Sequence, residues 1–342
     1  FFQAEDGIRD SSTSRELGDV YKRQEEKSMD LKLRAVPQEV YGVMELNENF
    51  NFQWNPDPVS SLIGLGTSYV LEFFEFYGER IGDYYDEFIP ESPQKDERFA
   101  LFVTQEKRHA AAHRKLNNFI TKGIAPPVRE TFHPRVYDFL YGAYKEMAEP
   151  IIGGIERDKA NGKKADGAFF KEAVRSIAIF ESQVCMTGLS FFENLFENGR
   201  FELVSNLSGN LGVLYLLGYH YTEEMEHCCV SIEAFETIYQ EKVWTRALVD
   251  QHIHSRDLLA SQVLLSTLHV ARMLNQQLTV EQITNSVAYQ YREQMAKKYI
   301  VEGFNAREPE ILARRKSLVE RWDNEWEPRL LEKIAQRIRA GA

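Results

Sequence analysis

Hydrophobic residues recur at intervals of three or four positions along most of this chain, which is the spacing of one face of an α-helix. No segment alternates between apolar and polar residues as a half-buried strand does, and no internal repeat is evident. The pattern therefore predicts an all-α protein, with helices over residues 60–89, 95–122, 135–156, 169–199, 211–240, 243–276, 279–304 and 308–338.

Turn-forming segments separate the predicted helices. Pro90 and Pro93 end the first one, because proline lacks a backbone donor and clashes with the preceding helical turn. The charged stretch 157–168 and the Ser, Asn and Gly-rich stretch 205–210 read as connections. The four long central helices then form two hairpins joined by a longer crossover, an arrangement typical of a four-helix bundle.

The same pattern divides the chain into parts. The first residues show neither period and resemble translated sequencing-adapter read-through, which makes Met29 the natural start. We interpret residues 1–28 as a non-native or disordered leader. The rest comprises an N-terminal extension over residues 29–59, the helical bundle over residues 60–240 and additional packing helices over residues 241–342.

Composition and charge narrow the function classes. The chain has 342 residues, 43% hydrophobic and 27% charged, which is ordinary for a globular protein. A net charge of −11 argues against a general nucleic-acid binder. Three cysteines do not form a disulfide framework, and neither a membrane span nor a signal peptide is evident. We expect a cytoplasmic protein that binds neither nucleic acid nor membrane.

One short stretch, GYHYTEEMEHCC, concentrates acids and histidines. Successive helical residues turn by about 100°, so Glu224 lies about 40° from His220, and His227 about 20° from it on the other side. These three side chains share one face of the helix, with the spacing His-x3-Glu-x2-His. Two other acids turn away from that face: Glu223 and Glu226.

A second helix repeats part of this motif. Glu106 and His109 have the same Glu-x2-His spacing, and His113 lies one turn further on. Paired Glu-x2-His motifs, with one Glu from each of two other helices, build the dinuclear carboxylate sites of ferritin-like bundles. The alternative is a pair of polar helix faces with incidental histidines. His113 itself is either a metal contact or a hydrogen-bonded partner of a ligand.

The geometry of a helical hairpin indicates which glutamate of the first predicted helix faces Glu106. In an antiparallel pair, the residue numbers of two facing positions always add up to the same sum, which is twice the number at the centre of the turn. Pairing Glu79 with Glu106 puts the midpoint at 92.5, inside the proline-bounded turn. Glu75 and Glu72 lie on the same stripe and compete with Glu79, but their midpoints fit slightly less well.

The same construction selects the acid of the second hairpin. Pairing Glu193 with Glu224 gives a midpoint of 208.5, inside SNLSGN, whereas Glu181 needs a turn near 202.5, within FELV, which is a poor turn sequence. The predicted metal ligands are Glu79, Glu106, His109, Glu193, His220, Glu224 and His227, with His113 as a further ligand or a hydrogen-bonding partner.

The segments FVTQEKRHAAAHRKLNNFI and YHYTEEMEHCCVSIEAF resemble the signature segments of the predicted metal-dependent hydrolases, a bacterial ferritin-like family. The similarity extends over roughly residues 40–300. The His-x3-Glu-x2-His helix is also similar to that of diiron arylamine N-oxygenases, which implies ligand roles for all three of its members. The chain departs from the family pattern at Asn194, Cys228 and Glu233.

These features predict a non-haem diiron enzyme that activates O2 to oxidise a small organic substrate. The resemblance implies a ferritin-like four-helix bundle with additional C-terminal helices, and two iron ions, or Mn or Zn, as cofactors. An electron-donor protein and a second copy of the chain are the partners considered. The alternatives are a metal-dependent hydrolase that uses a dimetal-activated water and, more weakly, a non-catalytic iron-storage protein.

Overall fold

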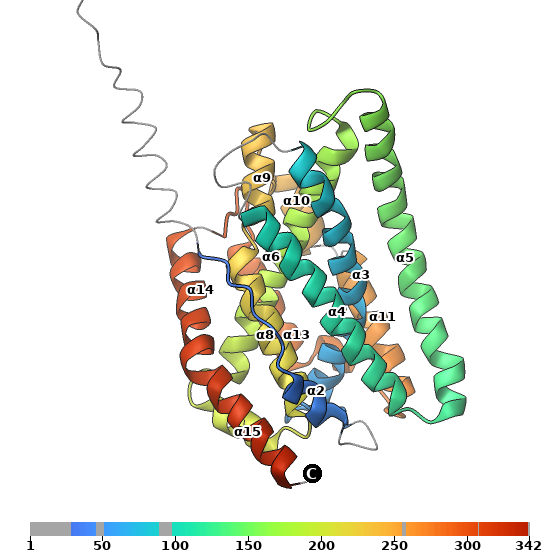
Figure 1. Ribbon diagram of the computed structural model, residues 1–342, viewed down its shortest axis with the longest axis vertical. Helices are drawn as coiled ribbons and strands as arrows, with labels where there is room; N and C mark the ends of the chain where they lie inside the picture. Colours follow the sequence, from blue (N-terminus) through green and yellow to red (C-terminus); the bar gives the residue numbers. More distant parts are fainter. Residues whose placement is uncertain (1–28, 46–50, 89–97, 255–257, 307, 341–342) are drawn as a thin grey trace, which may run out of the picture.

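The computed structural model describes residues 29–45, 51–88, 98–254, 258–306 and 308–340 (Figure 1). Every regular element within these ranges is a helix, so the all-α prediction is confirmed there. The interpretation of residues 1–28 as a leader falls outside the described residues, and so do Pro90 and Pro93.

Four long helices form the centre of the molecule: α3 (Pro58–Phe88), α4 (Ala100–Lys122), α6 (Ala168–Leu195) and α8 (Leu211–His227). They pack in a closed ring, α3 on α4, α4 on α8, α8 on α6 and α6 on α3. Each helix runs antiparallel to its neighbours. In the α3–α4 pair, for example, Tyr85 packs on Phe99 at one end, while Tyr69 lies 3.3 Å from Thr121 at the other.

The remaining helices surround this ring. They are α2 (Gln38–Glu45), α5 (Pro126–Ala160), α7 (Arg200–Leu207), α9 (Val230–Tyr239), α10 (Arg246–Val249), α11 (Leu258–Met273), α12 (Val280–Thr284), α13 (Val287–Tyr299), α14 (Pro309–Arg321) and α15 (Glu327–Ala340). Single π-helical turns follow α10 and α14. In Figure 1, α5 lies on one side of the molecule and α14 with α15 on the opposite side.

Several helix boundaries differ from the predicted ones. The predicted helix 211–240 is interrupted at Cys228 and Cys229, between α8 and α9. The predicted helix 135–156 begins earlier, at Pro126, because proline fits the first helical turn, where its missing N–H is not needed. The segment 200–207, expected to link two helices, is itself the short helix α7.

The C-terminal helices are anchored to the ring through aromatic packing. Trp322 and Trp326 are fully buried against Phe192 and Phe196 near the end of α6. Gly218 allows this approach, since a Cβ at that position would lie 2.3 Å from the Trp322 ring. The additional C-terminal helices are therefore part of the core.

An extended segment, residues 29–37, precedes α2 and crosses the outer side of α8 (Figure 1); we call it the N-terminal strap. It is held by side chains of α4 and α8. The Arg34 guanidinium forms two hydrogen bonds with Glu226, of 2.7 and 2.9 Å, and also contacts Asp323. The strap thus closes the bundle over α4 and α8.

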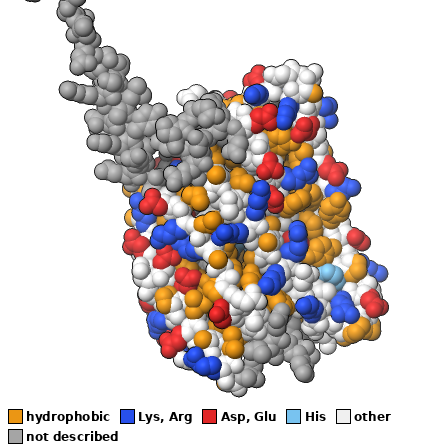
Figure 2. Space-filling view, viewed as in Figure 1, with side chains coloured by type: hydrophobic (Ala, Val, Ile, Leu, Met, Phe, Trp, Pro, Cys, Tyr) orange, Lys and Arg blue, Asp and Glu red, His pale blue; other side chains and the backbone are white. Residues whose placement is uncertain are grey.

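Within the described residues, no helix is both long and apolar enough to cross a membrane. On the face shown in Figure 2, acidic and basic side chains are interspersed with apolar ones.

Candidate metal centre

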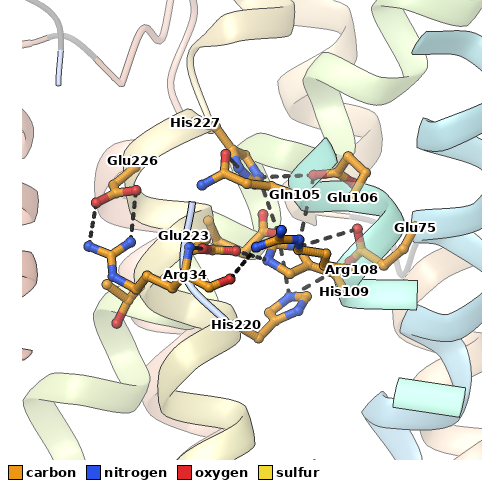
Figure 3. A network of polar contacts seen from close by, with 12 residues as sticks. Arg34, Glu75, Gln105, Glu106, Arg108, His109, His220, Glu223, Glu226 and His227 are labelled. Atoms are coloured by element: carbon orange, nitrogen blue, oxygen red, sulfur yellow. Dashed lines mark hydrogen bonds and ion pairs between the residues drawn. The ribbon is translucent and has the colours of Figure 1, made fainter. Parts of the chain in front are cut away.

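Seven buried side chains from all four ring helices meet in the middle of the bundle, and Figure 3 shows most of them. Each is no more than 1% exposed. Five of the seven predicted ligands are among them, because α4 and α8 bring their Glu-x2-His motifs face to face. The complete set is Glu75 from α3, Glu106 and His109 from α4, Glu181 from α6, and His220, Glu224 and His227 from α8.

The polar atoms that point into this cluster have no hydrogen-bond partner in the described part of the chain. They are Glu75 Oε1 and Oε2, Glu106 Oε1, His109 Nδ1, Glu181 Oε1 and Oε2, His220 Nε2, Glu224 Oε1 and Oε2, and His227 Nε2. Leaving a buried polar group unpaired costs about 1–3 kcal/mol, and more for a charged one. Ten such atoms at one place could together hold a cation.

The spacing of these atoms suits metal coordination. Glu224 Oε1 lies 3.1 Å from His109 Nδ1, 3.5 Å from His220 Nε2 and 3.2 Å from His227 Nε2. Two ligand atoms bound at about 2.1 Å and at a right angle to each other are about 3 Å apart. The observed separations are close to this value.

The donors form two groups that share residues. One contains Glu75, His109, His220 and Glu224, and the other contains Glu106, His109, Glu224 and His227. Within each group the donor atoms lie within 4.8 Å of one another. A carboxylate can bridge two cations through its two oxygens, whereas the single lone pair of an imidazole nitrogen serves only one. Glu224, whose Oε1 lies near all three histidines, could therefore serve both donor groups.

The charge of the cluster is also compatible with bound cations. The cluster contains four carboxylates and three imidazoles in a volume closed to solvent. Burying unpaired charge is costly, so four negative charges need compensation at close range. A bound metal ion could supply part of this compensation.

Glu79 is the first predicted ligand that the structure places elsewhere. It is 29% exposed and lies 3.9 Å from Lys107, while Glu75, one turn earlier, reaches the cluster. The constant-sum argument fixes the level along a hairpin, but it does not fix which face of the helix points inward. At the level of Glu106, the inward residue of α3 is Gly78.

Glu193 is the second. It accepts hydrogen bonds from Tyr291, at 2.6 Å, and from Arg314, at 2.9 Å, outside the cluster. Glu181 lies in the cluster at the place predicted for Glu193, with its Oε2 3.3 Å from His227 Nε2. The reason lies in the connection between α6 and α8, which spans residues 196–210 and includes α7. The centre of this connection is residue 203. The residue numbers of facing positions on α6 and α8 therefore add up to about the sum of 181 and 224, which pairs Glu181 with Glu224.

Hydrogen bonds on the outer side of two histidines fix their tautomers. His109 Nε2 donates to Glu223 at 3.0 Å, which leaves Nδ1 free for a metal. His227 Nδ1 donates to the Gln105 amide oxygen at 3.0 Å, which leaves Nε2 free. The N-terminal strap supports both partners, since its backbone N–H at Arg34 donates to Glu223 and its carbonyl at Lys32 accepts from Gln105.

His113 lies behind the third histidine. Its Nε2 is 3.0 Å from His220 Nδ1, and its Nδ1 is 2.9 Å from the Ser68 hydroxyl, which donates to Asn117. Both ring nitrogens of His113 are thus used in hydrogen bonds. It is a hydrogen-bonded partner of His220 rather than a member of either donor group, which decides between the two roles predicted for it.

Glu223 and Glu226 were expected to turn away from the ligand face, and they do, yet both are fully buried. Their positions became buried because the N-terminal strap covers this side of α8. Gln105, Ser68 and the strap were not identified from the sequence. The signal for the strap was weak, because Arg34 is 192 residues from Glu226 and an extended chain carries no helical period.

The electrostatics of the cluster reflect its crowded carboxylates. Burial and the nearby Glu106 raise the pKa of Glu75 well above its usual range. Burial alone lowers the pKa of His109, but the hydrogen bond to Glu223 and the nearby Glu224 carboxylate raise it to about 9. Burial and the neighbouring His109 lower the pKa of His113 to about 3, which keeps it neutral as an acceptor for His220.

Gly78 provides the room that the Glu106 carboxylate occupies, since a Cβ there would lie 3.1 Å from Glu106 Oε2. We expect Gly78→Ala to weaken metal binding by about tenfold, because a misplaced ligand costs roughly 1.4 kcal/mol or more. Titration with Fe(II) or Zn(II) measures the effect. Gly142→Ala on α5 is the control: its Cβ meets nothing within 4 Å, so metal binding should not change.

No protein-family model, no curated protein and no solved structure was found to match this chain. The resemblance to ferritin-like metal-dependent hydrolases therefore remains a prediction.

The donor set limits the chemistry available to the site. Calcium and magnesium prefer oxygen-only coordination, and structural zinc sites usually include thiolates. Here three imidazoles combine with four carboxylates, and the three cysteines lie outside both donor groups. Buried His and Glu groups of this kind could hold a metal ion.

Proposed function

We propose that this chain is a dinuclear metal enzyme of the ferritin-like class, which uses two iron ions to activate O2 and oxidise a small organic substrate. The observation that carries this proposal is the convergence of ten unpartnered donor atoms at a buried site formed by four helices. Structural carboxylates in a core pair with arginine or lysine, as Glu226 does with Arg34, whereas the carboxylates of the cluster contact no arginine or lysine among the described residues.

The mixture of ligand types supports iron and oxygen chemistry. Imidazole and carboxylate together suit non-haem iron, and a bound Fe(II) pair would supply the electrons that reduce O2. Four carboxylates and neutral histidines give no net charge with two Fe(II) ions, which suits a site closed to water. An external electron donor is then required for turnover.

The protein's own groups would hold this centre rigid. Glu223, Gln105 and His113 each hydrogen bond one of the three histidines and so set its tautomer and orientation. Glu224 Oε1 lies within 3.5 Å of a ring nitrogen of each of the three histidines, which belong to both donor groups. The enclosure of the donors excludes bulk water, which strengthens every electrostatic interaction inside the site.

The proposal is tested by metal loading and oxygen uptake. The chain, stripped with a chelator and given Fe(II) without oxygen, should bind two ions and then consume O2 when it is admitted. The Zn(II)-loaded chain should bind metal but consume none. If the iron-loaded chain consumes no O2 with any added reductant, yet the Zn(II) form hydrolyses esters or amides, the site is a hydrolase and the proposal is wrong.

A further inference from the structure

A cavity of about 430 Å³ lies beside the metal centre, lined by α3, α6, α7, α8, α11 and α13 and by the loop that precedes α3. None of the seven donors of the metal centre lines it. We propose that this cavity binds an amphipathic monocarboxylate, an apolar body with one carboxylate, as the substrate of the neighbouring metal centre. The substrate role depends on the function proposed above, but the binding role does not.

An aromatic wall links the cavity to the metal centre. Trp54 stacks on Phe191 with a centroid distance of 6.1 Å, and Phe191 packs on Tyr221 at 5.1 Å. All three line the cavity. Tyr221 in turn packs edge-on against His220 at 5.4 Å, so the wall ends on a donor of the metal centre.

Other lining residues also lie next to donors. Residues three or four apart on a helix share a face. By this rule Leu71 lies one turn before Glu75, and Leu217 one turn before His220. Val184, which also lines the cavity, follows Glu181 by one turn. The cavity lining and the donors are therefore neighbours along the same faces of three helices.

The character of the lining selects an apolar body for the ligand. Leucine, valine and aromatic side chains dominate the walls. Two of the most exposed hydrophobic side chains of the described chain, Leu203 at 57% and Val287 at 69%, are also lining residues. Apolar residues thus continue to the solvent side of the cavity, where an apolar ligand would enter.

Arg292 indicates that the polar group of the ligand is an anion. Its Nη2 donates to the Gln183 amide oxygen at 2.6 Å, and both residues line the cavity. Its Nη1 contacts Glu293, which is not a lining residue. Two other charged residues line the cavity. Asp57, which caps the first turn of α3, carries the charge that would repel a carboxylate, and Arg200 donates to the Asn194 carbonyl. Arg292 is paired as well, but its Nη2 is held by a neutral amide that a carboxylate could replace. Arg292, 21% exposed, is positioned to pair with a carboxylate.

The volume falls within the roughly 300–1,000 Å³ typical of small-molecule sites, which suits a chain of about ten carbons. Decanoate, 1-decanol and decylammonium are therefore matched probes that differ only in the polar group. Binding is followed by the fluorescence of Trp54 in the full-length chain, and a Trp54→Phe variant identifies that signal among the four tryptophans.

We expect decanoate to bind about tenfold more tightly than decylammonium, as one charge-assisted hydrogen bond would give. Arg292→Gln should remove the advantage of decanoate over 1-decanol and leave 1-decanol binding unchanged. Ala288→Phe, at a half-buried lining position, should block all three probes. Ala143→Phe, at a half-buried position of α5 outside the cavity, is its control and should block none.

Equal affinity for the three probes, or full binding by the Ala288→Phe chain, would overturn the proposal. Binding of the probes should not depend on the metal. We therefore expect the Glu224→Ala chain to bind decanoate as the unchanged chain does. If decanoate binds but the chain takes up no iron, the proposed function fails and the cavity ligand stands. If iron and O2 react but no probe binds, the cavity inference fails alone.

Discussion

Replacing Glu224 with alanine is expected to abolish the binding of both metal ions. Its carboxylate belongs to both donor groups and lies within 3.5 Å of His109, His220 and His227. Loss of a shared ligand removes the bridge and leaves each position one donor short, so affinity should fall by at least 100-fold, or about 2.7 kcal/mol. Competition with a chromophoric chelator measures it.

Glu79→Ala is the matched control for this experiment. Glu79 is a glutamate on a ring helix within one turn of a donor, but it lies outside the cluster beside Lys107. Metal affinity should therefore remain within about twofold of the unchanged chain. Equal losses in the two variants would show that the cluster does not hold the metal. Glu223 is unsuitable as a control because it holds His109.

Replacing Glu181 with glutamine is expected to shift stability in opposite directions with and without metal. In the metal-free chain, burial and the nearby Glu224 and Glu106 make a charge at Glu181 unfavourable, and these contacts raise its pKa well above the usual range. The neutral amide removes this cost. We expect the metal-free variant to be about 1–3 kcal/mol more stable in urea denaturation than the unchanged metal-free chain.

With metal the order should reverse. A bound ion stabilises the folded state by about 2.7 kcal/mol when its free concentration is 100 times the dissociation constant. A glutamine at 181 is a weaker ligand, so the variant should gain less from Fe(II) or Zn(II). Ser205→Ala on α7, away from the cluster, should show the same metal-dependent gain as the unchanged chain. Greater stability of the unchanged chain without metal would contradict a binding role for Glu181.

Much of the fold, and the donors on two of the four ring helices, could be predicted from the sequence. The motifs on α4 and α8 were predictable because helical periodicity alone places Glu106 with His109, and Glu224 with His227, on single faces. The same periodicity predicted the long helices of the ring, but it did not find the break after His227. It also did not find the division of the predicted helices 243–276 and 279–304 into shorter elements.

The other two donors required information that local periodicity does not contain. Glu75 and Glu79 are one turn apart on α3, and the choice between them depends on how closely α4 approaches at Gly78. Glu181 depended on the course of the α6–α8 connection, which contains a helix where a tight turn was expected. Both choices were decided by the packing of helices against one another.

The donors of this centre are widely separated along the chain, from Glu75 to His227, and they are closed from solvent on every side. A metal ion held there would leave only when the ring of four helices separates. The rate at which a strong chelator removes the metal should therefore be independent of chelator concentration and should equal the rate of that opening. The rate of metal release would then measure how often the four helices of the ring separate.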